Sequence, residues 1–353
     1  TIFGRGIDVV GVGGEATVVS VANPLATPHT GRVELFNSAL LAIEANVGGR
    51  SLRVSGGLVD IETTSLVSNG NLIVNASEAV VAEFSRFDAF SVTRDSAGAI
   101  VIRAPEVVLA NTTINAEAIG DGAPGRILIE TGDLFFFGVQ VEGDAKDGVG
   151  ADPGLIMLRS TGDLTLLNSE IRSNANGAAD GGVITIEGRD VEITETTVQS
   201  DTLVISSGNA GRVTVKADTL TIMGVNGRIT STTNGEGGGG DVIVDAGELN
   251  MGFKAAIRSD TRGPGDAGTV TLIAGTAALD GASITSRAEA DIGNAGSVLI
   301  DVGRLTLIDS TISSGTETPG NAGQVFVKAD DIVLDGDRRR FTTGISSDTF
   351  GGG

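Results

Sequence analysis

The clearest feature of the sequence is a short alternation of apolar and polar residues that recurs along most of the chain. The pattern G-x-[VIL]-x-[VIL]-x-small begins at ten glycines, spaced 27 to 29 residues apart. In the copy that starts at Gly211, RVTVKA alternates, LTI alternates again, and RITS forms a third such run before a glycine-rich loop. Alternation with a period of two is typical of strands, and no segment keeps a helical period long enough to compete. The glycines are Gly70, Gly98, Gly125, Gly154, Gly182, Gly211, Gly240, Gly268, Gly296 and Gly323.

This repeat predicts an all-β fold, a right-handed parallel β-helix or solenoid with about 28 residues and three short strands per coil. The positions two and four after each glycine are aliphatic in all ten copies. Side chains two apart on a strand point the same way, so these two columns should fill the interior. The position six after the glycine is occupied by small residues, valine at the largest, as expected at a corner between strands.

We expect one continuous domain with two parts. Residues 70–353 should form the ten-repeat β-helix. Residues 1–69 should form shorter coils at its N-terminal end, because similar runs recur there at a spacing nearer 20 residues.

Two further columns should face outward, where stacking makes equivalent positions direct neighbours. Five residues after the glycine, charge alternates in sign from coil to coil, and opposite neighbours favour the native register. This structural charge ladder consists of Arg103, Glu130, Arg159, Glu187, Lys216 and Asp245. Three residues after the glycine, the column is apolar except for three threonines, which predicts either plain β-propensity or a contact surface. The candidate interface stripe consists of Ile73, Val101, Leu128, Met157, Ile243, Leu299 and Phe326.

A column of serines follows the third strand of the repeat. Each serine lies two residues after an inward aliphatic residue, so its hydroxyl should also point inward. We interpret the column as a hydroxyl ladder between coils, because no base stands beside any serine to make it a nucleophile. Its members are Ser173, Ser200, Ser231, Ser259, Ser286, Ser314 and Ser347.

Composition narrows the chemistry. Basic and acidic residues number 24 and 45, so the net charge is −21. Cysteine, tryptophan and tyrosine are absent, and there is one histidine. Disulfides, cysteine nucleophiles and thiolate metal sites are therefore excluded, and the acidic chain is a poor candidate for nucleic-acid binding. No apolar stretch approaches the ~18 residues of a membrane-spanning helix. We expect no catalytic residues, no metal and no cofactor.

A glycan-active β-helix enzyme, a polysaccharide lyase or hydrolase, is the alternative. Such enzymes need acids, or an acid and a base, that converge on one groove. Asp241 and Asp245 share one face of a strand, but the sequence shows no cluster of acids in the adjoining coils and no tryptophan or tyrosine platform. Three or more converging carboxylates would favour the enzyme, whereas a smooth rod would favour a fibre.

Several segments resemble a known family. GNAGRVTVKADTLTI (208–222), GNAGSVLIDVGRLTLIDSTISS (293–314) and GNAGQVFVKADDIVL (320–334) resemble the repeats of cyanobacterial large exoproteins, which are similar to filamentous haemagglutinin, a two-partner-secretion passenger. GRVELFNSALLAI (31–43) and NGNLIVNASEAVVAEF (69–84) are similar to the segments that precede such repeats. The resemblance covers roughly residues 31–349 and is specific for the architecture rather than for an activity.

The resemblance implies secretion through an outer-membrane partner and service as a surface fibre or adhesin. The family's asparagine-rich secretion domain is not found, so we expect an internal or processed fragment of a longer protein. The sequence thus predicts a non-enzymatic, extracellular structural or adhesive protein of the bacterial surface. Its expected partners are other copies of itself, other surface components, or a glycan or cell-surface receptor.

Overall fold

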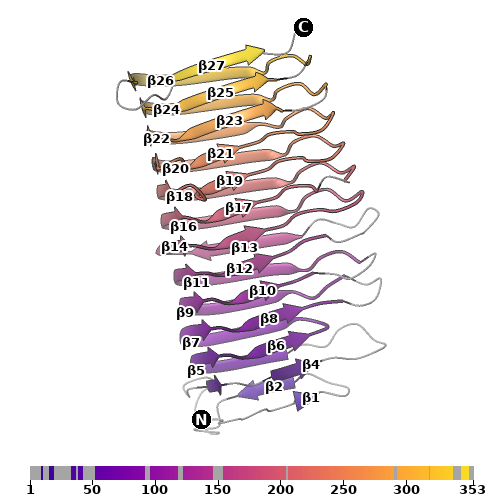
Figure 1. Ribbon diagram of the computed structural model, residues 1–353. Helices are drawn as coiled ribbons and strands as arrows, with labels where there is room; N and C mark the ends of the chain where they lie inside the picture. Colours follow the sequence, from indigo (N-terminus) through magenta and orange to yellow (C-terminus); the bar gives the residue numbers. More distant parts are fainter. Residues whose placement is uncertain are drawn as a thin grey trace.

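The computed structural model shows a single stack of β-coils (Figure 1). It describes residues 9–10, 16–19, 33–36, 39–42, 52–91, 96–117, 122–145, 154–203, 206–289, 292–317, 319–336 and 343–349. These residues form strands, turns and loops, with no helix among them. Every strand pair in the described part of the chain is parallel, and the strands form two sheets of 13 and 14 strands.

The larger sheet, here called the long-strand sheet, carries most of the residues of each coil. Its strands are β2 (Ala16–Val19), β3 (Val33–Phe36), β5 (Leu52–Glu62), β7 (Leu72–Glu83), β9 (Ile100–Ala110), β11 (Arg126–Phe137), β13 (Leu155–Ser160), β14 (Asp163–Leu167), β16 (Val183–Thr194), β18 (Arg212–Met223), β20 (Asp241–Gly252), β22 (Val270–Asp280), β24 (Ser297–Ile308) and β26 (Gln324–Asp335).

The short-strand sheet closes the coils on the other side. Its strands are β1 (Val9–Val10), β4 (Ala39–Ala42), β6 (Ser65–Ser68), β8 (Arg86–Ala89), β10 (Thr113–Asn115), β12 (Gln140–Glu142), β15 (Glu170–Arg172), β17 (Thr197–Gln199), β19 (Arg228–Thr230), β21 (Ala256–Arg258), β23 (Ser283–Ala288), β25 (Thr311–Thr316) and β27 (Gly344–Thr349).

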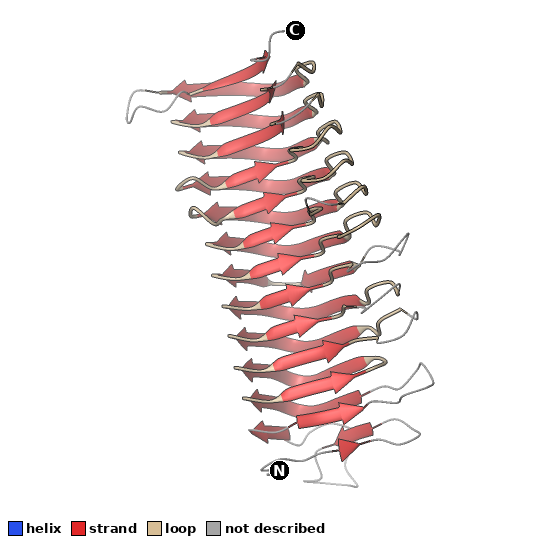
Figure 2. Ribbon diagram, turned by 45° about the vertical axis from the view of Figure 1, so that its right-hand side comes forward, coloured by secondary structure: helices blue, strands red, loops and turns tan. Residues whose placement is uncertain are grey.

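The chain climbs as a right-handed helix, as predicted. In Figure 1 the short strands of the nearer sheet run toward the right, and the long strands return toward the left behind them as the chain rises. Tight turns follow the long strands along one edge, whereas longer loops follow the short strands along the other (Figure 2). From β7 onward each coil is displaced from the next by 27 to 29 residues, as in the pairing of Val213 with Ile184 and Val242.

The prediction of three strands per coil was wrong in most coils. The first two runs form one bent strand, so β18 is continuous through the corner at Ala217, and only the coil with β13 and β14 is divided. Pairing with β20 continues on both sides of the corner and omits only Asp218. The inward positions change phase there, from Val213 and Val215 to Leu220 and Ile222. A small side chain permits this bend while the hydrogen bonds between coils persist.

One hydrophobic core runs through the interior of the stack. The two aliphatic columns are buried from Leu72 and Val74 to Val298 and Ile300, as predicted. In the last copy Val325 and Val327 are only partly buried, because β26 has a stacked neighbour on one side among the described strands. Burial of the aliphatic columns is the main source of stability in a chain without disulfides.

Strands from before residue 70 join the same two sheets. β5 pairs with β7 in a step of 20 residues, from Leu52 to Leu72, and a register shift after Gly56 accommodates the difference in length. β4 and β6 extend the short-strand sheet in the same way. The shorter coils therefore stack on the regular ones without a break in the described sheets.

The turn from each long strand to the next short strand contains a left-handed residue. Asn111, Asn168 and Gly138 suit this conformation, whereas Thr63 and Phe84 adopt it with φ of 48° and 49°. The turn is therefore imposed by stacking on neighbouring coils rather than by the local residue in every case.

Candidate functional site

The charge ladder lies on the outer face of the long-strand sheet. Arg103 pairs in register with Glu130, Glu130 with Arg159, Arg159 with Glu187, Glu187 with Lys216, and Lys216 with Asp245. Side-chain ion pairs join Arg103 to Glu130 at 2.6 Å and Arg159 to Glu187 at 3.1 Å. Exposed pairs of this kind contribute at most about 1 kcal/mol each, so their effect on register remains a prediction.

Reversing one charge tests the ladder. Glu187→Lys would place three cations in consecutive coils, between Arg159 and Lys216, and we expect it to lower the melting temperature, more at low salt than at high salt. The matched control is Glu192→Lys on the same strand, since Glu192 stacks between Thr165 and Thr221. Thermal unfolding at low and high ionic strength gives the comparison. An unchanged melting temperature of Glu187→Lys at low salt would remove the ladder from the account.

The interface stripe also faces outward, between the two buried columns. It is continuous over four coils, where Ile73 pairs with Val101, Val101 with Leu128, and Leu128 with Met157. Threonines separate the remaining members, Ile243, Leu299 and Phe326, from this run. All seven side chains are partly or largely exposed, and Phe326 is 59% exposed.

The serine column forms the predicted hydroxyl ladder, with a partner that the sequence did not reveal. Each hydroxyl donates a hydrogen bond to the carbonyl of the leading glycine of the next repeat, as Ser200 does to Gly182 at 2.7 Å and Ser286 to Gly268 at 2.7 Å. Ser173 and Ser200 also donate to carbonyls of the preceding coil. The column is buried except for Ser347 in the last coil. The hydroxyls are therefore structural donors.

The acids singled out in the sequence do not form a free pair. Asp241 makes an ion pair with Arg212 at 3.2 Å, and Asp245 lies beside Lys216 in the ladder. Each carboxylate is thus next to a cation on the coil before it. This arrangement offers a stabilised surface rather than an acid and a base that face one substrate.

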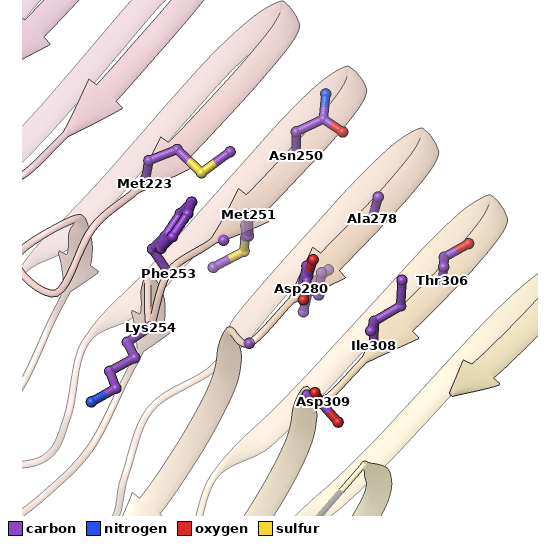
Figure 3. A pocket seen from close by; sticks show the side chains of 13 residues that line it. Met223, Asn250, Met251, Phe253, Lys254, Ala278, Asp280, Thr306, Ile308 and Asp309 are labelled. Carbon is purple, nitrogen blue, oxygen red and sulfur yellow. The ribbon is translucent and has the colours of Figure 1, made fainter. Parts of the chain in front are cut away.

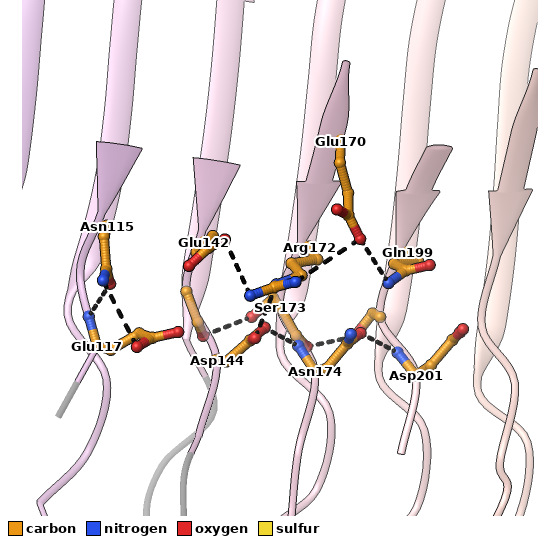
Figure 4. Close-up of polar contacts among 12 residues, drawn as sticks. Asn115, Glu117, Glu142, Asp144, Glu170, Arg172, Ser173, Asn174, Gln199 and Asp201 are labelled. Atoms are coloured by element: carbon orange, nitrogen blue, oxygen red, sulfur yellow. Dashed lines mark hydrogen bonds and ion pairs between the residues drawn. The ribbon is translucent and has the colours of Figure 1, made fainter. Parts of the chain in front are cut away.

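A different cluster of acids, which sequence reasoning missed, lies on the outer face of the short-strand sheet (Figure 4). Arg172 is its centre and contacts Glu142 at 2.9 Å, Asp144 at 2.9 Å and Glu170 at 3.8 Å. Burial acts to lower the pKa of Arg172, but attraction to Asp144, Glu142 and Glu170 raises it. Three carboxylates therefore converge, but on a guanidinium that stays charged.

Hydrogen bonds to backbone tie this cluster to the coils beside it. Asp144 accepts from the N–H of Asn174 at 2.8 Å, and the side chain of Asn174 accepts from the N–H of Asp201 at 2.9 Å (Figure 4). Gln199 donates to Glu170 at 3.2 Å. The only sequence indication was a polar residue directly after most members of the serine column.

The same polar position places two carboxyl groups in buried surroundings farther along the stack. Asp201 accepts a hydrogen bond from the N–H of Thr232 at 2.7 Å, and Asp260 accepts one from the N–H of Arg287 at 2.9 Å. Burial raises the pKa of each aspartate to about 6. For Asp260, Arg287 and Arg258 act to lower the pKa and Glu289 acts to raise it. These carboxyls bridge coils at the start of the long loops.

Asp260 predicts a specific pH dependence of stability. Its pKa is about 6 in the folded protein against an ordinary value of 3.8, so the folded state holds an extra proton between about pH 4 and pH 6. The free energy of unfolding should therefore fall as pH rises through this window. Asp260→Asn, which keeps an acceptor for Arg287, should flatten the fall by about 1–3 kcal/mol.

Urea unfolding of the two proteins at pH 4, 5, 6 and 7 measures this effect. Asp218→Asn, at an exposed corner, is the control and should leave the pH profile parallel to that of the wild type. A constant difference between Asp260→Asn and the wild type across these pH values would contradict the assignment.

The described residues contain no group of three or more histidine, cysteine or acidic side chains arranged to hold a metal ion. No helix in the described part of the chain is long and apolar enough to cross a membrane. Searches of protein-family models, curated proteins and solved structures give no match for the chain.

Proposed function

We propose that the protein is a non-enzymatic structural and adhesive component of the bacterial cell surface, a rod or fibre of stacked β-helix coils. The observation that carries this proposal is the uninterrupted stack. One hydrophobic core and two parallel sheets continue through the described coils, and neighbouring coils are joined by the serine–glycine hydrogen bonds. Such a solenoid resists bending along its length, because each coil contacts its neighbours over its whole perimeter.

The resemblance of the repeats to filamentous-haemagglutinin-like exoproteins supports the same function. In that family the β-helix is a secreted surface fibre, and export through an outer-membrane partner follows from membership. We extend these properties, including the extracellular location, to this chain as part of the proposal.

Self-association through the interface stripe is the second part of the proposal. A continuous apolar run on an otherwise charged surface often marks an interface. The run from Ile73 to Met157 crosses four consecutive coils and lies beside a ladder of alternating charge. Two such faces can bury their apolar columns against each other while the ladders form the rim.

Val101→Lys tests this contact against a control on the same strand. Val101 lies in the stripe, whereas Val108 faces outward beyond the corner of β9, and both are partly buried. Native material should form long or laterally paired particles by electron microscopy and ultracentrifugation. Val101→Lys should shift it to smaller species, and Val108→Lys should not. Short single particles of the wild-type protein would refute the fibre.

The cluster around Arg172 favours a glycan-active enzyme as the second candidate. Glu142, Asp144 and Glu170 are the three converging carboxylates that such a reading requires, and Glu170 is 34% exposed. Incubation with neutral and uronate-containing polysaccharides, followed by assays for new reducing ends and unsaturated products, tests this function. Turnover that Glu170→Gln abolishes would establish the enzyme and end the structural proposal.

A further inference from the structure

A groove of about 500 Å³ interrupts the outer surface where β18, β20, β22 and β24 end (Figure 3). It lies at the edge of tight turns, away from the Arg172 cluster and outside the interface stripe. Ligand pockets in proteins are typically about 300–1,000 Å³, so the groove has the size of a small-molecule site.

The groove forms because the repeat is broken here in two ways. Gly252 has no side chain in a column that holds Met223 one coil earlier and Asp280 and Ile308 in the two coils that follow. The turn after β20 has three residues before β21, where regular turns have two. Phe253 and Lys254 both adopt positive φ, 52° and 69°, and the insertion turns them outward. One wall is therefore raised while the floor is lowered.

The lining combines an aromatic ring with polar groups of both kinds. Phe253 is 78% exposed, which is unusual for a phenylalanine without a partner. Met223 and Ile308 add apolar surface, while Asn250 and Lys254 bring donors (Figure 3). These features make the groove amphipathic rather than simply greasy.

Two carboxylates lie on consecutive coils at the other side of the groove. Asp280 is exposed, and Asp309 is buried, with 8% of its surface accessible. The Oδ1 atom of Asp309 has no hydrogen-bond partner in the structure. A buried carboxylate oxygen without a donor is costly, so this position demands a donor from outside the chain.

We propose that this groove binds a neutral sugar ring of a glycan. The hydroxyls of a sugar donate to Asp280 and Asp309 and accept from Asn250 and Lys254, while the apolar face of the ring lies against Phe253. A neutral polyol fits a lining that holds both signs of charge, whereas a basic peptide would meet Lys254 and an acidic one the two aspartates. The inference rests on the proposed adhesive function and names the class of its receptor.

An array of immobilised neutral, acidic and basic ligands, followed by calorimetric titration of the oligosaccharides that bind, tests the proposal with the whole chain. The neutral oligosaccharides should bind without being cleaved. Phe253→Ala and Asp280→Asn should each weaken binding about tenfold or more, because each removes a direct contact. Asp309→Asn should weaken it as well, with the melting temperature confirming the fold.

Phe84→Ala is the matched control, since Phe84 is 59% exposed and occupies the equivalent turn position in a coil without the groove. It should leave binding unchanged. Absence of Phe253-dependent binding to every neutral oligosaccharide, or preferential binding of a lysine-rich peptide, would overturn the inference while leaving the fibre proposal intact. Cleavage of a bound oligosaccharide would instead refute the non-enzymatic function.

Discussion

Gly211→Ala is expected to destabilise the coils around it by more than about 3 kcal/mol, a large effect for the addition of one methyl group. A Cβ atom at Gly211 would lie 2.0 Å from the carbonyl oxygen of Gly182 and 2.2 Å from the hydroxyl of Ser200. Neither atom can retreat without loss, because Ser200 donates to that same carbonyl and Gly211 N–H donates to the carbonyl of Ser200. Relief of the clash requires the two coils to separate.

Gly143→Ala is the matched control for this substitution. Gly143 is also buried between coils, but a Cβ there would meet its nearest neighbour, Ile156 Cγ1, at an ordinary 3.4 Å. Chemical unfolding should show a large drop in stability for Gly211→Ala and a small change for Gly143→Ala. Equal stabilities would mean that the leading glycines mark the repeat without holding the coils together.

Phe136→Ala is expected to lower the free energy of unfolding by about 3–5 kcal/mol. Phe136 is fully buried and stacks between Leu109 of the coil before and Leu166 of the coil after it. Truncation leaves a cavity that neighbouring coils cannot fill, because their own spacing is set by the hydrogen bonds of two sheets.

The adjacent phenylalanine gives the comparison. Phe135 points outward and is 39% exposed, so Phe135→Ala should change stability by no more than about 1 kcal/mol. Urea unfolding of the two variants, with Phe136→Leu as a conservative third, separates burial from loss of an aromatic residue. Similar losses for Phe135→Ala and Phe136→Ala would contradict the inward and outward alternation on which the fold rests.

Much of the fold could be predicted because the repeat couples local alternation to stacking. Val213 and Val215 point inward for the local reason that strand side chains alternate, and the repeat brings each beside its equivalents. The same stacking makes Glu187 a neighbour of Arg159 and Lys216. The coil, its core columns and the order of the ladder therefore follow from the sequence alone.

Hydrogen bonding between coils was beyond the reach of the sequence. The bend at Ala217 preserves strand pairing, so two predicted strands are one, and no residue pattern distinguishes a bend from a break. The link from Ser200 to Gly182 likewise joins positions 18 residues apart whose common purpose appears only when the chain has coiled. In both cases the decisive partner is a backbone group, which carries no sequence label.

The candidate sites depend on departures from the repeat. Arg172 meets carboxylates from its own and the preceding coil, and these are ordinary surface acids when read along the chain. The groove exists because Gly252 leaves a gap and one inserted residue turns Phe253 outward. The sequence by itself determined the interior, since every coil repeats the same apolar positions. Tertiary structure decided the sites, because an irregular side chain acquires its neighbours only from adjacent coils.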